Sequence, residues 1–261
     1  MTSLSRKFWC WVSYVGTAVI VIGLFATTGW TASAAPGDGP VPPTLEQAIE
    51  YYIRTHPEVI EQSLQELEAK REAEEKTRQK VALGKRQQDL LNDPSSPISG
   101  NLSGDLTLVE FYDYRCGYCK RAADAVTQLQ KEDPRVRVIY KDFPILGEPS
   151  ELAAKAALAS KAQGKHQAFH EALLASNGDM TKESILAIAQ KVGLDAKRLV
   201  ADMANPEWQA VIEKNRALAS QLGISGTPGL IVGTDLVPGA LDLKGLKDFI
   251  ARAGMPPPTG R

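Results

Sequence analysis

The chain has 261 residues, and its 30 lysines and arginines nearly balance its 31 aspartates and glutamates. This near-neutral charge, with no basic patch, argues against nucleic acid as a partner. Three cysteines are too few for a small scaffold held together by disulfides, so they indicate either thiol chemistry or a single structural disulfide.

The first 34 residues are predicted to direct export. Arg6 and Lys7 precede residues 8–37, which carry no charge and include a long apolar stretch followed by small residues. The pattern predicts a signal peptide cleaved near Ala34, or an uncleaved membrane anchor, because the apolar stretch approaches the ~17–25 residues that span a bilayer. In either case the positive charge before this stretch predicts that the rest of the chain is exported. Cleavage would remove Cys10 and leave two cysteines.

A helical extension, residues 44–92, is predicted to follow a Pro/Gly-rich linker at residues 35–43. Thr44 and Gln47 have the spacing of a capping box, which marks the start of a helix. Four apolar residues of this first helix fall on one face: Leu45, Ile49, Tyr52 and Ile53. A second helix is predicted to begin at Pro57, because proline is tolerated in the first turn.

This extension has too few apolar residues to form a core of its own. The second helix is apolar on one face as far as Leu67 and almost entirely polar from residue 68 to residue 80. A short amphipathic helix pair must bury its apolar stripe against something. Two outcomes are expected to compete: residues 44–67 bring copies of the chain together as a homo-oligomer, or they pack on the chain's own globular domain.

Residues 93–254 are predicted to form an α/β domain, with a short tail at residues 255–261. The domain begins where the sequence Asn92-Asp93-Pro94-Ser95-Ser96-Pro97 ends the helix. Apolar runs predict four strands: Leu106–Tyr112, Val136–Tyr140, Gly229–Gly233 and Leu236–Val237. Helical patterns follow the first strand, fill residues 150–222, and close the domain at residues 243–253. This order predicts an α/β fold with a helical insertion.

The sequence Cys116-Gly117-Tyr118-Cys119 lies between the first strand and a helix, a position that predicts a dithiol alternating with a disulfide. Cys116 begins the helix, where unpaired backbone N–H groups and the helix dipole stabilise a thiolate, the reactive nucleophile. Cys119, one turn later, is placed to attack the mixed disulfide and release the substrate. Three nearby cations favour the thiolate and a more oxidising pair: Arg115, Lys120 and Arg121.

The cysteine pair also fits other roles. It can be a structural disulfide, or a copper(I) site in a non-enzymatic surface protein, because soft thiolates suit that ion. A zinc site is disfavoured, since it needs two further ligands and no second cysteine pair is present. His166 and His170 have the spacing of half a metal site, but no third ligand accompanies them. We therefore predict ordinary helix residues there and no metal.

Two segments together resemble the DsbA-like branch of the thioredoxin superfamily. They are Val109–Lys120, with the sequence VEFYDYRCGYCK, and Gly226-Thr227-Pro228. The extension is similar to that of ScsC-type periplasmic proteins, through Leu45–Leu67 with its HPEVI segment. The resemblance implies a thioredoxin fold with an inserted helical domain, a location in the periplasm or cell envelope, and thiol–disulfide exchange with protein substrates. We expect no cofactor beyond the redox-active pair, and a membrane redox partner that recharges it.

The resemblance also implies roles for residues outside the dithiol. Thr227 and Pro228 match the family's cis-proline loop, where the backbone of Thr227 would pair with an extended substrate segment. Glu110 matches a buried acid beneath the dithiol, whose raised pKa would let it relay a proton as Cys119 reacts. The alternative for Glu110 is a carboxylate in water near a sheet edge.

The two residues between the cysteines, Gly117 and Tyr118, are expected to tune the redox potential. Tyr118 stands where the strongest oxidases of the family have histidine, so the direction of the reaction is left open. Some members with a similar extension oligomerise and act as isomerases, whereas monomeric relatives act as oxidases. We predict an enzyme that forms or shuffles disulfides, either as an oligomeric isomerase or as a monomeric oxidase.

Overall fold

The computed structural model describes residues 44–253, so the predicted signal segment, the linker and the C-terminal tail lie outside the described residues. The chain divides into two compact units, Met1–Pro57 and Glu58–Arg261. Within residues 44–253, none of the helices combines the length and the apolar character needed to cross a bilayer.

The described part of the first unit is helix α1, Leu45–Thr55. Its predicted capping box is present: the Gln47 N–H donates to Thr44 Oγ1 at 3.3 Å, and the Thr44 N–H donates to Gln47 Oε1 at 3.0 Å. No residue of α1 is buried. The four residues of its apolar stripe are 40–76 % exposed: Leu45, Ile49, Tyr52 and Ile53.

Helix α2, Pro57–Lys85, has 29 residues with proline in its first turn as predicted, and all of it after Pro57 belongs to the second unit. Apolar side chains in its first half, such as Ile60 and Leu64, are exposed, whereas Leu83 near its end is fully buried. Gln79 Nε2 donates to the Leu222 carbonyl at 3.1 Å. The last turns of α2 are therefore part of the globular domain.

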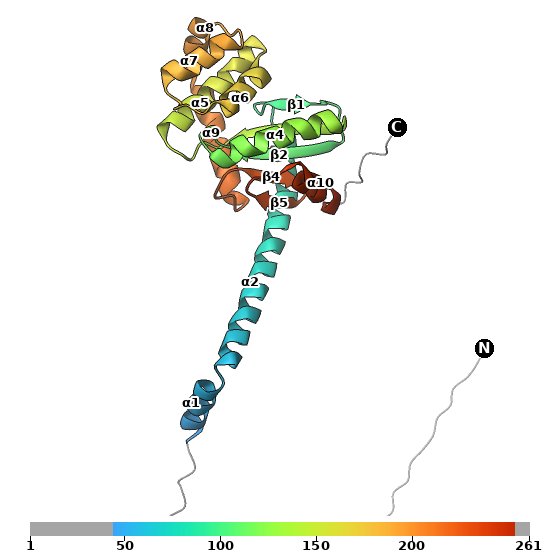
Figure 1. The fold of residues 1–261 in the computed structure, drawn as a ribbon, viewed down its shortest axis with the longest axis vertical. Coiled ribbons are helices and arrows are strands. Elements are labelled where there is room, and N and C mark those ends of the chain that lie inside the picture. The colour runs from blue at the N-terminus through green and yellow to red at the C-terminus, as the bar shows by residue number, and fades with distance from the viewer. Residues whose placement is uncertain (1–43, 254–261) are drawn as a thin grey trace, which may run out of the picture. The chain divides into compact units, whose positions relative to one another are not determined.

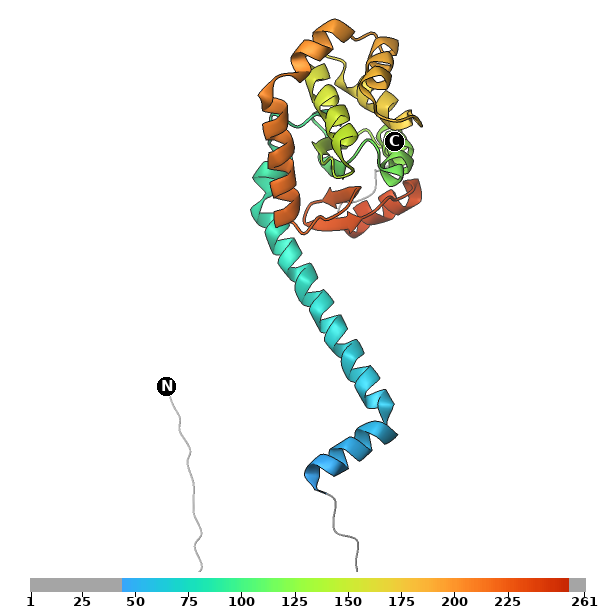
Figure 2. The same cartoon turned by 90° about the vertical axis from the view of Figure 1, so that its left-hand side faces the viewer.

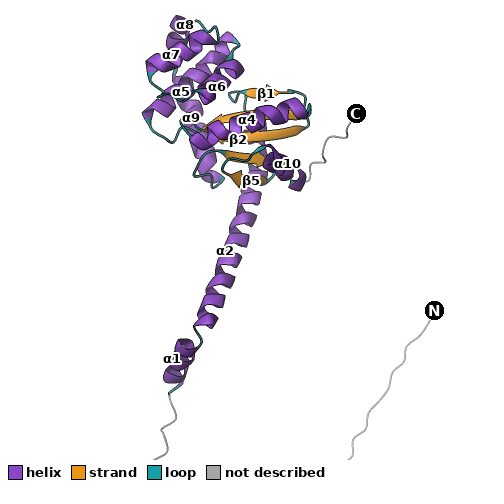
Figure 3. Ribbon diagram, viewed as in Figure 1, coloured by secondary structure: helices purple, strands orange, loops and turns teal. Residues whose placement is uncertain are grey.

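Five strands form one mixed sheet (Figures 1 and 3). The strands are β1 (Ile98–Gly100), β2 (Leu106–Tyr112), β3 (Val136–Asp142), β4 (Gly229–Val232) and β5 (Asp235–Pro238). Their order across the sheet is β1-β3-β2-β4-β5. β2 and β3 are parallel, and every other pair is antiparallel. β2 is thus the central strand, as its nearly continuous apolar sequence predicted.

The helices that follow α2 fall into two sets. Beside the sheet lie α3 (Gln87–Leu91), α4 (Gly117–Glu132) and α10 (Leu243–Arg252). Between β3 and β4 in sequence come α5 (Glu148–Ala159), the 3₁₀ helix η1 (Ser160–Gln163), α6 (His166–Ala175), α7 (Lys182–Lys191), α8 (Ala196–Met203) and α9 (Pro206–Gln221). Figure 2 shows this second set, in yellow to orange, grouped beyond one end of the sheet, with α9 running back toward β4.

Side chains of β2 alternate between two cores, one on each face of the sheet. Leu108 and Tyr112 point into the core that α4, α6 and α10 cover. Val109 and Phe111 point into the opposite core, which contains Leu83 of α2 together with residues of α3 and α9. The same alternation directs Glu110 to the α4 side, beneath the helix that carries the cysteines.

A buried ion pair fixes the segment that joins α3 to the sheet. Lys141 of β3 is 0 % exposed, and its Nζ lies 3.2 Å from Asp93 Oδ2 and 2.8 Å from the Asp89 carbonyl. Burial alone would raise the pKa of Asp93, but the hydrogen bonds from Ser95 and the nearby Lys141 hold it well below its usual range. The polar sequence that ends the extension is therefore anchored inside the domain.

Candidate active site

The cysteines are placed by the turn that joins β2 to α4. The Cys116 N–H donates to the Asp113 carbonyl at 3.1 Å, and the Arg115 N–H donates to Asp113 Oδ1 at 2.7 Å. Cys116 is the N-cap residue of α4, and its side chain makes no cap hydrogen bond. The positive end of the helix dipole therefore lies at this sulfur, where it favours a negative charge.

The two cysteines differ in access to solvent. Cys116 is 8 % exposed and Cys119 is 0 % exposed, and neither is bonded to another cysteine. Burial and the neighbouring Glu110 raise the pKa of the Cys119 thiol far above its usual value. Cys119 is therefore held as a thiol, and Cys116 is the sulfur that a substrate can reach.

The loop before β4 lies beside Cys116. Gly229 pairs with Phe111 near the end of β2, and this register brings the preceding Thr227 and Pro228 to the dithiol. The Thr227–Pro228 bond is cis, and Cys116 Sγ donates to the Thr227 carbonyl at 3.2 Å. The structure therefore brings together the two segments on which the family resemblance depends.

Glu110 lies within the sheet and not at its edge, so the alternative of a hydrated carboxylate is wrong. It stands between Tyr140 of β3 and Leu230 of β4, and it is 2 % exposed. Its Oε1 atom has no hydrogen-bond partner within the described chain. Burial raises the pKa of Glu110 to about 8, so the carboxyl is largely protonated at neutral pH.

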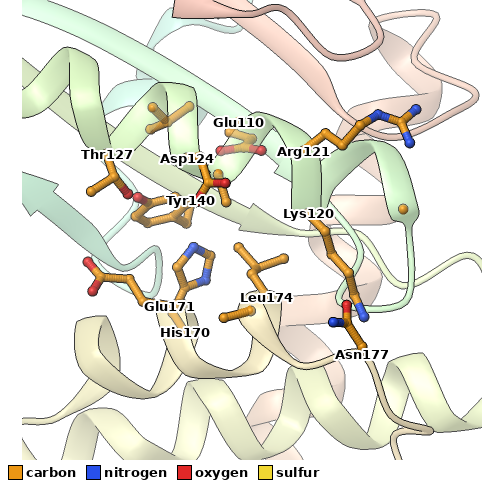
Figure 4. A pocket seen from close by; sticks show the side chains of 14 residues that line it. Glu110, Lys120, Arg121, Asp124, Thr127, Tyr140, His170, Glu171, Leu174 and Asn177 are labelled. Carbon is orange, nitrogen blue, oxygen red and sulfur yellow. The ribbon is translucent and has the colours of Figure 1, made fainter.

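A cavity of about 610 Å³ opens over Glu110 between α4 and α6 (Figure 4). Asp124 and Thr127 of α4 line it on one side, and His170 and Glu171 of α6 line it on the other. A buried carboxyl with an unpartnered oxygen thus faces a space wide enough for water.

The predicted cations Arg115, Lys120 and Arg121 contact groups other than the sulfur of Cys116. Arg115 Nη1 donates to the Leu146 carbonyl at 2.6 Å, and Lys120 Nζ donates to the Ser176 carbonyl. The Arg121 guanidinium lies 4.2 Å from the centre of the Tyr118 ring. Their side chains are thus used as structural contacts. Tyr118 itself is 59 % exposed beside Cys116.

Gly117, the other residue between the cysteines, has open space around it. A side-chain carbon at this position would meet no atom within 4 Å. Steric fit therefore does not require glycine here, and the expected influence of Gly117 and Tyr118 on the redox potential stays a prediction.

Sequence reasoning missed a buried chain of hydrogen bonds behind the dithiol. Tyr112 donates to Asp142 Oδ1 at 2.7 Å, its hydroxyl lies 3.0 Å from that of Tyr114, and Tyr114 lies 3.0 Å from His170 Nδ1. Tyr114 belongs to the turn that precedes Cys116, whereas His170 belongs to α6. The chain therefore ties the dithiol turn to the inserted helices. The only sequence signal was two tyrosines on alternate positions next to CGYC.

The histidines are part of the packed interior. His166 and His170 stack with ring centres 5.7 Å apart, and both are buried. Burial lowers the pKa of His166 to about 3 and that of His170 well below its usual value. Among residues 44–253, no group of three or more histidine, cysteine or acidic side chains is arranged to hold a metal ion.

The model of the DSBA-like thioredoxin domain matches residues 107–251, which is more than half of the chain. The chain therefore belongs to the family of DSBA-like thioredoxin domains. This family and the observed sheet and helices confirm the predicted fold, a thioredoxin fold with inserted helices and an N-terminal helical extension.

Solved structures agree with this assignment. A thioredoxin-like oxidoreductase from Silicibacter pomeroyi is 47 % identical with a TM-score of 0.63, covering 64 % of this chain and 97 % of that one. The thiol-disulfide exchange protein α-DsbA2 from Wolbachia pipientis is 32 % identical with a TM-score of 0.64, covering 68 % and 96 %. A linker-deletion variant of ScsC from Proteus mirabilis is 25 % identical with a TM-score of 0.63, covering 83 % and 98 %.

The curated relatives that the chain matches are much longer proteins. The Na⁺/H⁺ antiporter NhaA 1 of Salinispora arenicola is 27 % identical over 158 residues, which are 60 % of this chain and 24 % of that protein. The chain thus spans about a quarter of the length of such relatives. Their name describes those proteins as a whole, of which this chain matches only a part.

Proposed function

We propose that the protein is an exported thiol–disulfide oxidoreductase that forms or shuffles disulfides in envelope proteins. One observation carries the proposal. Cys116 lies at the N-terminus of α4 beside the Thr227 carbonyl, and its partner Cys119 is buried over the acid Glu110. This arrangement supports the proposed roles of Cys116 as attacking sulfur, Cys119 as resolving sulfur and Glu110 as proton carrier in disulfide exchange.

In the oxidising direction, a substrate thiolate attacks Cys116 of the Cys116–Cys119 disulfide. The S–S bond breaks, a mixed disulfide forms at Cys116, and Cys119 leaves as a thiolate. A second substrate thiolate then attacks the substrate sulfur of the mixed disulfide, so Cys116 leaves and the substrate gains a disulfide. Two electrons pass to the protein, and the membrane redox partner would remove them. Shuffling begins instead with attack by the Cys116 thiolate on a substrate disulfide.

Glu110 is proposed to carry the proton that Cys119 gains or loses. Its carboxyl is protonated near neutral pH, whereas the raised pKa of Cys119 makes the departing thiolate a strong base. Transfer of a proton from Glu110 to Cys119 therefore runs downhill when the disulfide opens, and the reverse transfer prepares Cys119 for attack. The cavity between α4 and α6 supplies the space through which water can restore the proton.

Thr227 and Pro228 are proposed to align the substrate. The Thr227 carbonyl contacts Cys116 Sγ, so an extended segment that pairs with Thr227 would carry its cysteine to this sulfur. The Pro228 carbonyl is already bonded to the Gly239 N–H at 2.7 Å, which fixes the loop from behind.

We further propose that the extension joins copies of the chain, so that several active sites act together as an isomerase. The exposed apolar stripe of α1 and the exposed side chains of Ile60, Leu64 and Leu67 in α2 support this proposal. The ScsC structure also covers more of this chain than the Silicibacter protein does. The alternative is a monomeric oxidase whose stripe stays in contact with solvent.

Oligomerisation is tested by light scattering of the full chain. We expect Ile49→Asp to reduce the mass to that of a monomer and to abolish refolding of a protein with scrambled disulfides, because a charge in the stripe prevents its burial. Tyr51→Asp is the matched control, since Tyr51 is 71 % exposed but lies outside the stripe. If wild type is a monomer, the proposed oligomerisation is wrong. If Ile49→Asp and Tyr51→Asp have equal isomerase activity, the oligomer is not needed for that activity.

The activity itself is tested with a peptide whose disulfide joins a fluorophore to a quencher. We expect the reduced protein to release fluorescence, and alkylation of Cys116, the sulfur that can be reached, to abolish the release. Copper(I) binding without any release would favour the non-enzymatic alternative.

A further inference from the structure

A chain of hydrogen bonds runs from the buried carboxyl of Asp142 to the cavity over Glu110. Tyr112 Oη lies 2.7 Å from Asp142 Oδ1 and 3.0 Å from Tyr114 Oη, and Tyr114 Oη lies 3.0 Å from His170 Nδ1. His170 and Glu110 both line the cavity between α4 and α6 (Figure 4). All five side chains are 1–3 % exposed, so the protein itself decides in which direction their hydrogen bonds run.

The chain can run in two directions, because a tyrosine hydroxyl both donates and accepts a hydrogen bond. Burial and the neighbouring His166 lower the pKa of His170 well below its usual value, so the ring is neutral and only one nitrogen carries a proton. When Asp142 is ionised, it accepts from Tyr112, which accepts from Tyr114. Tyr114 then accepts from Nδ1–H of His170, so Nε2 has no proton and is an acceptor.

Protonation of Asp142 reverses this chain. Asp142 Oδ2 has no hydrogen-bond partner within residues 44–253, so a proton there would be a buried donor with nothing to accept it. A proton on Oδ1 instead donates to Tyr112, which then donates to Tyr114. Tyr114 donates in turn to Nδ1 of His170, and the ring proton lies on Nε2. One carboxyl therefore decides whether Nε2 is a donor or an acceptor.

A proton can reach Asp142 along the chain from the cavity. It binds Nε2 of His170, and the Nδ1 proton passes to the Tyr114 hydroxyl. The proton that Tyr114 held passes to Tyr112, and the one that Tyr112 held passes to Asp142 Oδ1. Each group in between gains one proton and loses one, so the net change is one proton on Asp142. The same shift leaves the chain in its reversed direction.

The groups around Asp142 allow this change near neutral pH. Burial raises the pKa of Asp142 to about 7, against the lowering effects of the Tyr112 hydrogen bond and of Lys161 in η1, while Asp113 raises it. Asn215 of α9 donates to the Asp142 main-chain carbonyl at 3.1 Å. The titratable groups that face Glu110 and His170 from outside the chain are Cys119, Lys120, Arg121 and Asp124 of α4, Tyr140 of β3, and His166 and Glu171 of α6.

We propose that Asp142 determines which ring nitrogen of His170 carries the proton, and thereby controls how readily Glu110 ionises. Through water in the cavity, an Nε2–H group donates toward Glu110 and stabilises its carboxylate, whereas Nε2 without a proton accepts and stabilises the protonated carboxyl. Asp142 is a positioning residue, because it acts through His170. This inference rests on the proposed function and adds regulation by pH: protonation of Asp142 keeps the Glu110 carboxylate accessible in a mildly acidic medium.

Nitrogen-15 NMR of the reduced full-length protein tests the first link. The signals of His170 report which nitrogen is protonated, and they are identified by their loss in His170→Gln. We expect the wild-type proton to move from Nδ1 to Nε2 as pH falls, with a midpoint near the pKa of Asp142, about 7. Asp142→Asn cannot titrate and Tyr114→Phe interrupts the chain, so both should abolish the change. If Asp142→Asn does not fold, Tyr114→Phe decides, since it keeps both carboxyls.

Tyr140→Phe is the matched control for this NMR measurement. Tyr140 is 6 % exposed, and its hydroxyl lies 3.0 Å from Ser99 Oγ, outside the chain. We expect Tyr140→Phe to keep the movement of the His170 proton. Glu110→Gln should keep it as well, with the same midpoint, because Asp142 is the group that titrates. Loss of the movement in Glu110→Gln would assign it to Glu110 and overturn the proposal.

The pH dependence of disulfide exchange tests the second link. Tyr114→Phe frees Nδ1 of His170, so Nε2 can carry the proton and donate toward Glu110. The step in kcat/KM that Glu110 sets should therefore move to lower pH, by roughly 0.5–1 unit. An unmoved step would show that His170 does not act on Glu110.

The two measurements separate this inference from the proposed function. If the His170 proton does not move with pH in wild type, or still moves in Tyr114→Phe, the role of Asp142 is wrong and the oxidoreductase stands. If wild type exchanges no disulfides, the proposed function fails together with the link to Glu110. The NMR result alone then decides whether Asp142 controls His170.

Discussion

Replacement of Cys116 by serine is expected to lower the rate of disulfide exchange by at least about a thousandfold. A serine oxygen cannot form the mixed disulfide through which electrons pass, and the remaining Cys119 is fully buried. The rate is measured with the fluorogenic disulfide peptide under conditions of single turnover. Exchange at the wild-type rate would show that Cys116 is not the attacking sulfur.

Cys119→Ser is the matched substitution three residues away, and it should behave differently. The sulfur of Cys116 is still present at the start of α4, so the first attack on a substrate disulfide proceeds. The intramolecular step that releases the substrate is lost, and a mixed disulfide should accumulate. Mass spectrometry of the protein without reductant detects this species by its added mass. Rapid release without accumulation would show that Cys119 is not the resolving sulfur.

Glu110→Gln is expected to raise the free energy of unfolding of the reduced protein relative to wild type, and by more at pH 8 than at pH 5. The folded state raises the pKa of Glu110 to about 8, from 4.5 in the unfolded chain. Between these values the folded state binds more protons than the unfolded state, so wild type loses stability as pH rises. The neutral amide is free of this loss. The free energy of unfolding of the variant minus that of wild type should increase by on the order of 3 kcal/mol from pH 5 to pH 8.

The measurement is urea unfolding of the reduced protein at both pH values. Asp142, whose pKa burial raises to about 7, titrates in the same window, so only the difference between variant and wild type isolates Glu110. Glu183→Gln removes a carboxyl from an exposed position and should change the unfolding free energy by no more than about 0.5 kcal/mol. A pH-independent difference for Glu110→Gln would mean that this carboxyl is ionised in the folded protein.

Local patterns in the sequence predicted much of this architecture. The capping box of Thr44 and Gln47, the apolar run of β2 and the proline that opens α2 all act over a few residues. The placement of CGYC between a strand and a helix is local in the same sense. Such features are decided by neighbours in the chain, and they were predicted correctly.

Elements that depend on distant partners were missed. β1 has three residues and exists through its pairing with β3, about forty positions later, so no apolar run marks it. The helix α8 lies inside the region predicted to be helical, but its own bounds were not predicted. The contacts of Asp113 with Ile145 and of Tyr114 with His170 join segments far apart in the chain. The directions of Arg115 and Lys120 are likewise set by carbonyl groups that only the fold brings near.

Side chains of β2 alternate between two separate cores, and this separation affects which substitutions the chain can accumulate during evolution. Glu110 and the cysteines belong to one face of the sheet, while Leu83, Leu218 and Leu222 fill the interior behind the other. Substitutions that are far apart and share no partners have nearly independent effects. Substitutions in the core that contains Leu83 can therefore raise or lower the stability of the protein while the chemistry of the dithiol is unchanged.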